Sequence, residues 1–153
     1  MMDNYQLKLL DLKQAIEVNW LMDFINQNYP VKAHPITFDD FYCSKKMYFQ
    51  IYFNENIIGI SGIDQKTPTL AETIRTIVNK EARGQGHGKN ISHLIEQKCV
   101  QLGIKKVMST IYSHNVEMIS IKLKQGYTIE GYHPHHEAPG FHEYSMGKIL
   151  STN

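Results

Sequence analysis

A glycine-rich hexapeptide, Arg83-Gly84-Gln85-Gly86-His87-Gly88, contains the residues of this chain best suited to bind a phosphate group. It joins an apolar, β-rich run, Thr73 to Val78, to a segment with helical periodicity that begins near Gly88. Successive glycines let the backbone curl so that several N–H groups point into one concavity. The N-terminus of the following helix adds partial positive charge. The arrangement therefore predicts a pyrophosphate-binding loop.

The spacing of the glycines distinguishes three patterns of phosphate binding. A P-loop, G-x-x-x-x-G-K-[ST], does not fit, because three residues separate the first and last glycines and Asn90 replaces the metal-binding hydroxyl. The dinucleotide fingerprint, G-x-G-x-x-G, needs glycine at Lys89, and no acidic residue follows at the ribose-binding distance. The remaining pattern, [R/Q]-x-x-G-x-[G/A], is met by Arg83, Gly86 and Gly88. A glycine-rich turn without a ligand is the alternative that the hexapeptide alone leaves open.

That pattern resembles the acetyl-CoA-binding signature of the GNAT superfamily of acyl-CoA N-acyltransferases. Asn115, followed by Lys124-Gln125-Gly126-Tyr127, resembles the family's asparagine at the start of a later helix and its K-x-G-[FY] ending. The resemblance implies acetyl-CoA as donor, a small-molecule or peptide primary amine as acceptor, and direct transfer in a ternary complex without a metal. The implied cofactor-binding residues are Thr76, Ile77 and Val78 for the pantetheine arm, Arg83, Gly84, Gln85, Gly86, His87, Gly88 and Lys89 for the pyrophosphate, and Asn115.

Glu72 is the first candidate for acid–base chemistry. It shares an alternation face with three apolar residues, Leu70, Ile74 and Val78. A charge on such a face is costly unless it has a partner or a role. Glu72 also lies as far before the glycine motif as the catalytic glutamate of the histone acetyltransferase branch, which implies that it removes the amine proton through water. A solvated carboxylate or a salt bridge to a residue such as Arg75 is the alternative.

Lys122 is the second candidate, and it departs from the family pattern. Many members place a tyrosine seven residues after the asparagine, where it protonates the departing thiolate; Lys122 occupies that position. Seven residues are about two helical turns, so Lys122 should lie over Asn115 and face the cofactor. Its ammonium could stabilise or protonate the thiolate, particularly if burial lowers its pKa. A solvent-exposed lysine, or one that contacts a CoA phosphate, is the alternative. Four tyrosines are substitute acids: Tyr112, Tyr127, Tyr132 and Tyr144.

Histidines and acidic residues gather between the last two predicted strands, as His133, His135, His136, Glu137, His142 and Glu143. Their spacing matches no zinc pattern such as H-E-x-x-H, and proline and glycine make the segment a loop, so no metal site is expected. In the family, the connection before the last strand usually forms part of the acceptor pocket. The resemblance therefore implies that Tyr132, His135, His136 and Glu137 recognise the amine.

Length and composition fit one domain over residues 1–153. The net charge of +1 is scattered along the chain, which argues against nucleic-acid binding. Cys43 and Cys99 form no C-x-x-C motif, so a reducing cytoplasm is the expected compartment. No apolar run reaches the length of a signal peptide core or a membrane span.

Hydrophobic periodicity predicts the elements that must position these residues. Strands are predicted at 7–12, 47–53, 57–63, 70–78, 106–112, 127–132 and 144–150, and helices at 15–26, 37–45, 89–102 and 113–125. The last helix is expected to turn Val116, Ile119 and Leu123 inward. This order is similar to the GNAT fold, an α/β (α+β) architecture with a mixed, mostly antiparallel central sheet, splayed at the cofactor site and flanked by about four helices.

Two other functions remain open at this point. A non-catalytic CoA-binding or regulatory module on the same fold is one, because the family's tyrosine is missing at Lys122. A nucleotide-binding protein is the other, although both nucleotide glycine patterns fail. The identity of the acceptor is open, because selectivity depends on pocket shape rather than bulk charge. The resemblance also allows a homodimer.

Overall fold

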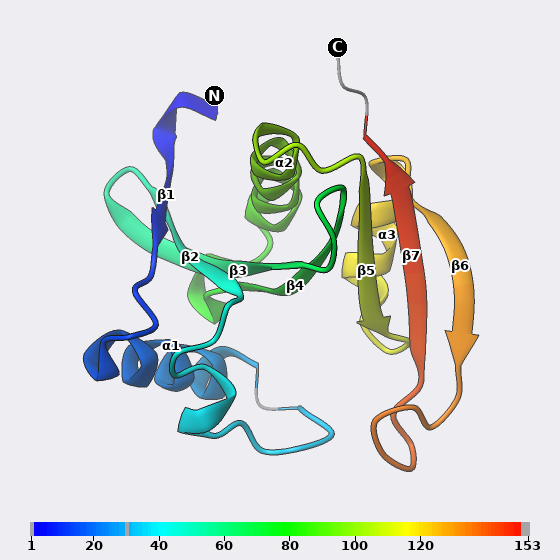
Figure 1. The fold of residues 1–153 in the computed structure, drawn as a ribbon, viewed down its shortest axis with the longest axis horizontal. Coiled ribbons are helices and arrows are strands. Elements are labelled where there is room, and N and C mark those ends of the chain that lie inside the picture. The colour runs from blue at the N-terminus through cyan, green and yellow to red at the C-terminus, as the bar shows by residue number, and fades with distance from the viewer. Residues whose placement is uncertain (1, 30, 151–153) are drawn as a thin grey trace.

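The computed structural model of the protein describes residues 2–29 and 31–150, so residues 1 and 151–153 of the expected domain lie outside it. Seven strands form one sheet in the order β1-β2-β3-β4-β5-β7-β6 (Figure 1). The strands are β1 (Tyr5–Leu9), β2 (Met47–Phe53), β3 (Asn56–Gln65), β4 (Leu70–Val78), β5 (Lys106–Tyr112), β6 (Thr128–His133) and β7 (Glu143–Ile149). The helices are α1 (Ala15–Asn28), α2 (His87–Gln101) and α3 (Val116–Lys124), with short 3-10 turns η1 (Met2–Asn4), η2 (Phe38–Asp40) and η3 (Lys80–Ala82).

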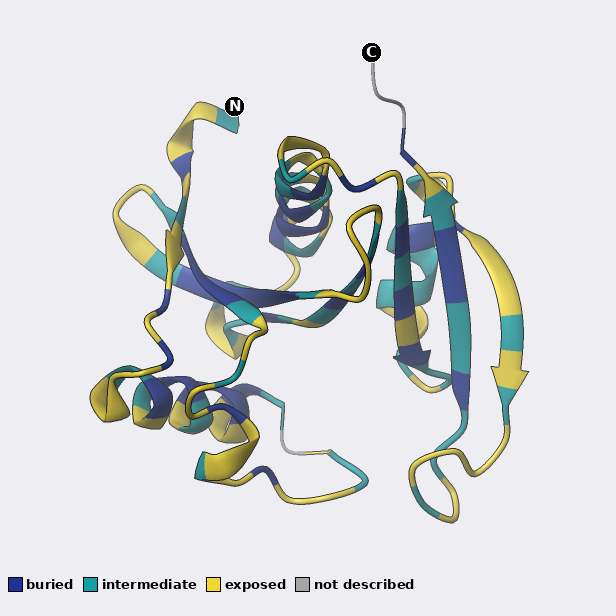
Figure 2. Ribbon diagram, viewed as in Figure 1, coloured by how far each residue is buried: buried dark blue, intermediate teal, exposed yellow. Residues whose placement is uncertain are grey.

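The sheet is covered on both faces, and each face has its own hydrophobic core (Figures 1 and 2). On one face, α1 contributes Leu21 and Ile25, which pack with Ile60 of β3. On the other face, α2 contributes Ile91 and Ile95. Helix α3 joins the α2 side, because its Met118 and Ile119 pack against that second core. A ligand that reaches both α1 and α3 must therefore pass through the plane of the sheet.

Strands β4 and β5 provide such a passage, because they pair over only three residues. Their parallel register joins Leu70 to Lys106, Ala71 to Val107 and Glu72 to Met108. Beyond these pairs β4 continues to Val78 and β5 to Tyr112, and the two strands diverge (Figure 1). Every other strand pair is antiparallel. The expected mixed, mostly antiparallel sheet with a splayed strand pair is confirmed.

A β-bulge in β4 corrects the predicted alternation of this strand. Arg75 has a positive φ of 48°, and the β3–β4 register shifts between Ile60 and Gly62. Before the bulge, Ile74 packs on the α1 side; after it, Ile77 packs on the α1 side and Val78 on the α2 side. The bulge adds one residue and reverses the alternation. Val78 therefore faces away from Glu72, and the predicted common face is wrong at Val78.

The hairpin predicted around Asn54-Glu55-Asn56 is confirmed. Phe53 of β2 pairs with Asn56 of β3 across a two-residue turn. Asn54 and Glu55 both have positive φ, 47° and 69°, the geometry whose twist matches the flanking strands.

Other predicted bounds move by a few residues, and one predicted helix is largely lost. Strand β1 begins at Tyr5 and ends at Leu9, because Leu10 and Leu12 turn into the α1-side core. Where a helix to Lys45 was predicted, only the 3-10 turn η2 forms, and within the described residues there are three α-helices rather than about four. Cys43 ends this segment with a positive φ of 57° and donates its N–H to the Leu12 carbonyl.

Helix α3 is rotated relative to the prediction. Val116 and Leu123, which were expected to point inward, are 69% and 47% exposed, whereas Lys122 is 2% exposed. At 3.6 residues per turn, Met118, Ile119 and Lys122 form one stripe, and Val116 and Leu123 lie roughly 100° from its centre. The buried stripe therefore includes a lysine.

Candidate active site

A cavity of about 630 Å³ occupies the divergence of β4 and β5. Its walls include residues 73–77 of β4 and 109–112 of β5. Ile25 and Tyr29 line it from the α1 side, and Asn115, Met118 and Lys122 line it from the α3 side. Because α1 and α3 cover opposite faces, the cavity crosses the sheet. Groups bound on the two faces could meet there.

The glycine loop lies at the N-terminus of α2, as predicted. Gly84 and Gly86 have positive φ of 77° and 83°, and Gly86 is the residue that caps α2. Residues 83–86 are exposed, and a Cβ built on Gly84 or Gly86 would meet no atom within 4 Å. The first N–H groups of a helix lack partners inside the helix. The loop and the first turn of α2 thus offer accessible backbone amides beside a positive helix end.

The side chain of His87 is directed away from a phosphate-binding role. It is 6% exposed, and its Nδ1 lies 2.6 Å from the Tyr5 hydroxyl. Its ring also packs against Phe53, with ring centroids 4.9 Å apart. Only the backbone amide of His87 is placed to bind a ligand at the loop.

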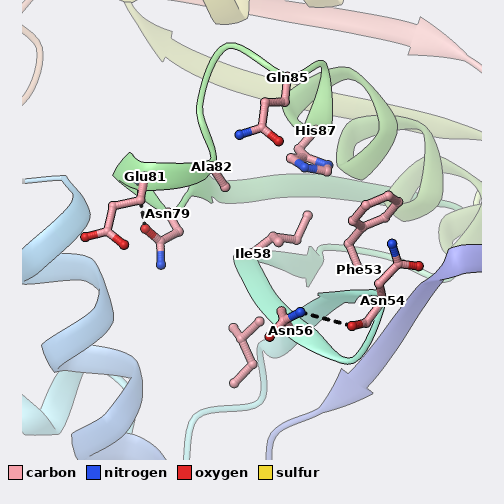
Figure 3. Close-up of a pocket in the computed structure, with 10 residues that line it drawn as sticks. Phe53, Asn54, Asn56, Ile58, Asn79, Glu81, Ala82, Gln85 and His87 are labelled. Atoms are coloured by element: carbon pink, nitrogen blue, oxygen red, sulfur yellow. Dashed lines mark hydrogen bonds between the residues drawn. The ribbon is translucent and has the colours of Figure 1, made fainter.

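A second, smaller hollow of about 370 Å³ lies against the glycine loop (Figure 3). It is bounded by the turn between β2 and β3, by η3 and by the loop itself, with Gln85 and His87 above Phe53 and Ile58. It shares no lining residue with the cavity between β4 and β5. The side chains of Gln85 and His87 therefore belong to this hollow rather than to that cavity.

Arg83 connects the glycine loop to the ends of β4 and α1 through hydrogen bonds. Its Nε donates to the Val78 carbonyl at 3.2 Å, and its Nη2 donates to the Asn28 carbonyl at the end of α1. Asn28 in turn accepts from the Lys80 N–H at 2.9 Å. The predicted cofactor ligand Arg83 thus contacts main-chain carbonyls and sets the position of the loop.

The remaining predicted cofactor residues lie at the cavity or close to it. Thr76 and Ile77 line it, while Val78 does not. The Thr76 hydroxyl lies 2.7 Å from the Ser61 hydroxyl. Because β4 pairs with β5 only from Leu70 to Glu72, the β4 backbone at Thr76 has no strand partner on the β5 side. Asn115 lines the cavity and also caps α3, since its Oδ1 accepts from the Met118 N–H at 3.2 Å. Gly88 and Lys89 lie in the first turn of α2.

Lys122 is enclosed between α2 and α3 and still reaches the cavity wall. Its Nζ donates to the Ser92 hydroxyl at 2.7 Å and lies 4.6 Å from the centre of the Tyr127 ring. Burial lowers the pKa of Lys122 from 10.5 to about 8, against the opposing effect of the Glu96 carboxylate. The alternative of a solvent-exposed lysine is wrong.

The substitute tyrosines differ in position. Tyr112 lines the cavity, whereas Tyr127, Tyr132 and Tyr144 do not. Burial raises the pKa of Tyr127, which is 2% exposed, and that of Tyr112, whose hydroxyl donates to Glu137. Of the four, only Tyr112 could reach a group inside the cavity.

Glu72 lies where β4 and β5 begin to separate. Its Oε1 accepts a hydrogen bond from the Thr110 hydroxyl at 3.2 Å, and its Oε2 lies 3.6 Å from the Lys66 ammonium. The salt-bridge alternative is therefore realised with Lys66 rather than with Arg75. Arg75 instead donates to the Tyr48 hydroxyl at 3.0 Å. Glu72 lines the cavity, with a hydrogen-bond donor on one carboxylate oxygen and the Lys66 ammonium near the other.

Two of the four predicted acceptor residues, His136 and Glu137, line the cavity. The Tyr112 hydroxyl donates to Glu137 Oε2 at 2.6 Å, and the Glu137 carbonyl lies 2.8 Å from His34 Nε2. Tyr132 is 51% exposed and, like His135, is absent from the cavity wall. The loop before β7 therefore closes the α1 side of the cavity through His136 and Glu137.

In residues 2–29 and 31–150, no three histidine, cysteine, aspartate or glutamate side chains converge as metal ligands. Over the same residues, no helix combines the length and apolar character needed to cross a membrane.

Comparison with known proteins places these features in a family. The family model described as "Acetyltransferase (GNAT) family" matches residues 15–127, which include the glycine loop and most of the cavity wall. The chain belongs to the GNAT acetyltransferase family. None of the curated proteins compared with this GNAT sequence matches it significantly.

Solved GNAT structures share the fold at low sequence identity. A GNAT family acetyltransferase from Elizabethkingia anophelis with acetyl-CoA bound has a TM-score of 0.76 at 15% identity, with 97% of this chain and 99% of that chain covered. The ribosomal-protein-S18-alanine N-acetyltransferase from Escherichia coli has a TM-score of 0.79 at 12% identity, with 97% and 96% covered. Mutant forms of the spermidine/spermine N-acetyltransferase from Vibrio cholerae give 0.77 at 14%, with 96% and 94% covered.

One cavity residue of this GNAT protein, Glu143, is not evident from the sequence, where it stands out only as a neighbour of the histidines. Glu143 opens β7, is 4% exposed and lines the cavity. Its pairing with Tyr112 across β5 and β7 places it there. A glutamate immediately before an apolar strand was the available signal, but its strand partner could not be read from the sequence.

Proposed function

We propose that this protein moves the acetyl group of acetyl-CoA to a primary amine by direct transfer in a ternary complex. The observation that supports it best is the cavity that crosses the sheet between β4 and β5, together with the exposed glycine loop in the segment that follows β4. Donor and acceptor can then approach the reacting carbon from opposite faces, which is the arrangement that direct transfer needs.

On the donor side, the amides of Gly84 to Lys89 hold the pyrophosphate at the N-terminus of α2. The free β4 edge at Thr76, Ile77 and Val78 receives the pantetheine arm. The exposed loop and the unpaired β4 edge support this assignment, as does the acetyl-CoA bound in the related Elizabethkingia anophelis structure. Asn115 contributes its side chain from the start of α3.

Lys122 acts on the leaving group. When the amine nitrogen bonds to the thioester carbon, the C–S bond breaks and its electron pair remains on sulfur. Lys122 lines the cavity from the α3 side, and in this proposal its ammonium gives the thiolate a proton or balances its charge. A pKa of about 8 keeps the group protonated at neutral pH and ready to donate.

The acceptor is a small-molecule or peptide amine held on the α1 side by His136 and Glu137, which line the cavity. That Tyr132 and His135 bind the acceptor remains a prediction. That Glu72 removes the amine proton also remains a prediction. The related enzymes named for spermidine/spermine and for the alanine of ribosomal protein S18 suggest the compounds to test first. We also propose one domain over residues 1–153, able to form a homodimer.

The test is an acceptor screen with detection of free thiol. Purified protein and acetyl-CoA are mixed with spermidine, an alanine-terminated peptide, a lysine-containing peptide, an amino sugar and free amino acids. We expect acetyl-CoA to bind and at least one amine to release thiol. Binding of acetyl-CoA without thiol release from any amine would support the non-catalytic module, and binding of ATP without binding of CoA would support a nucleotide-binding protein.

Lys122→Met tests the acid, with Lys105→Met as the control because Lys105 is an exposed lysine at the turn before β5. We expect Lys122→Met to lower kcat by about 100-fold, in the range of general acid catalysis, without weakening acetyl-CoA binding. Unchanged kcat in Lys122→Met would remove Lys122 from the reaction.

A further inference from the structure

Glu143 is a buried carboxyl group, and none of the ion pairs within residues 2–29 and 31–150 includes it. It is 4% exposed and lines the cavity between β4 and β5. A buried carboxylate usually requires a cationic or hydrogen-bonding partner. The partner of Glu143 is a second carboxyl, Glu137, with which it forms a hydrogen bond. The neighbouring carboxyl of Glu137 favours the protonated form of Glu143.

The sheet register fixes where this pair lies. Glu143 stands opposite Tyr112 on β5 and opposite His133 on β6. Residues directly opposite in antiparallel strands lie on the same face. Thr110 shares that face two residues before Tyr112 and donates to Glu72. Glu143 is thus on the face of the sheet that Glu72 occupies, opposite the face covered by Lys122 and α3.

The groups around the pair hold it in place and set its charge. Tyr112 donates to Glu137 at 2.6 Å, and the Tyr29 ring stacks on Tyr112 with centroids 6.4 Å apart. The titratable and charged groups that line this side of the cavity or face Glu143 from adjacent strands are Tyr29, Lys32, His34, Asp40, Lys46, Glu72, Arg75, Tyr112, His133, His136 and Glu137. Burial, the Glu137 hydrogen bond, and the charges of Glu137 and Glu72 raise the pKa of Glu143 to about 7.

We propose that the Glu137–Glu143 carboxyl pair accepts the proton from the acceptor's ammonium group; this rests on the proposed acetyl transfer. The ammonium gives one N–H proton to the pair, and the freed lone pair forms the N–C bond as the C–S bond breaks. The nitrogen then loses a second proton as the amide forms, and the thiolate gains one. One proton is released to solvent for each acetyl group transferred.

Glu72, the acceptor predicted from the sequence, is less suited to this step. Its two oxygens are already engaged by Thr110 and Lys66. A proton on Glu72 would have to compete with these two contacts. Glu143 has no such cation in the described ion pairs and is surrounded by groups that favour proton uptake.

The test compares wild type with Glu143→Gln, Glu137→Gln and a control, Glu130→Gln. Glu130 lies on β6 in an ion pair with Lys106 and does not line the cavity. For each protein, kcat/KM for the best amine of the screen is measured from about pH 5.5 to about pH 10, with acetyl-CoA affinity and Tm as checks of folding.

We expect wild-type kcat/KM to rise with pH through about 7, because the unprotonated pair is needed. Glu143→Gln should lose about 100-fold at neutral pH, retain its acetyl-CoA affinity, and recover as the amine deprotonates in solution at high pH. Glu137→Gln should move the rising limb to lower pH, because the like charge and the hydrogen bond that raise the Glu143 pKa are gone. Glu130→Gln should match wild type.

The inference would be overturned if wild type is active and the rise of kcat/KM near pH 7 persists in Glu143→Gln. It would also be overturned if Glu143→Gln lowers kcat/KM equally at neutral and at high pH. If Glu143→Gln does not fold, a rise of kcat/KM in Glu137→Gln at the same pH as in wild type would also overturn the inference. A wild type that acetylates no amine would instead overturn the proposed function itself.

Discussion

Lys122 is a charged residue in a place that the fold would normally give to an apolar one. It belongs to the buried stripe of α3, and its ammonium contacts a hydroxyl, Ser92, and an aromatic ring, Tyr127, rather than a carboxylate at salt-bridge distance. Keeping the charge there opposes folding, since burial disfavours the ammonium form. We infer that Lys122 is retained for its chemistry at the cavity.

This burial predicts a pH dependence of stability. The folded-state pKa of about 8 lies below the ordinary value of 10.5, so the unfolded chain binds more protons between these values. The free energy of unfolding should therefore rise with pH across this window, and the destabilisation should be complete below about pH 8. Relative to Lys122→Met, wild type should gain about 2 kcal/mol between about pH 7 and about pH 10.

Urea denaturation of both proteins at these pH values measures the difference, and other titrating groups cancel in it. Parallel pH dependences for wild type and Lys122→Met would contradict the prediction. Lys105→Met should show no pH-dependent difference from wild type, because its side chain is exposed.

Individual residues of the site differed in how far the sequence could place them. The glycine loop could be placed because its conformation depends on local backbone freedom at Gly84 and Gly86. Lys122 could be placed through helical periodicity from Asn115. Glu143 could not, because its position depends on the pairing of β7 with β5, two strands separated by a helix, another strand and a long loop.

At the scale of elements, α2 positions the glycine loop and is bounded by a left-handed glycine at each end. Gly86 precedes it with φ 83°, and Gly103 follows it with φ 80°. An added Cβ would meet no atom within 4 Å at either position. Gly86 and Gly103 therefore both require a left-handed backbone conformation, but only Gly86 belongs to the proposed pyrophosphate loop.

Gly86→Ala and Gly103→Ala should each destabilise the protein by about 1 kcal/mol, the usual cost of a left-handed alanine. Only Gly86→Ala should weaken acetyl-CoA binding, because only that residue orients amides toward the pyrophosphate. Denaturation and calorimetric titration separate the two effects. Equal affinities for acetyl-CoA in both variants would show that the Gly86 backbone is not part of the cofactor site.

Most elements could be predicted because their periodicity is local. The β2–β3 hairpin was evident from Asn54-Glu55-Asn56, residues that accept the turn conformation. The short η2 turn could not be foreseen, because Thr37, Asp39 and Asp40 favour a helix start while the left-handed Cys43 ends the segment. The bulge at Arg75 was invisible for a similar reason: its positive φ is held by contacts of the guanidinium with Tyr48 and Phe41, which are distant in sequence.

At the scale of the whole molecule, the cavity separates two parts of one sheet. Strands β1 to β4 lie on one side of it, and β5, β7 and β6 on the other, with three residue pairs of β4 and β5 between them. A donor bound in this gap would contact both parts and supply interactions that the free protein lacks there. A ligand that binds only the native state stabilises it by RT ln(1 + [L]/Kd), which increases with the logarithm of ligand concentration.

Acetyl-CoA at about 100 times its Kd should therefore raise Tm by roughly 5–10 °C, whereas ATP at the same concentration should have little effect. ATP provides phosphates for the glycine loop but no arm to occupy the gap. Thermal unfolding monitored with each ligand gives the comparison. Equal shifts with ATP and acetyl-CoA would mean that the gap contributes nothing to donor binding.

The β4 bulge makes the number of residues in this strand a requirement of the fold. One extra residue at Arg75 lets Glu72 face one side while Val78 reaches the other. With the bulge retained, one residue inserted within residues 73–76 would shift the rest of the strand by one position and exchange the environments of Ile77 and Val78. Homologues that vary in loop length should therefore add no residue to this segment, and a single-codon insertion here should be tolerated far less well than most amino-acid replacements.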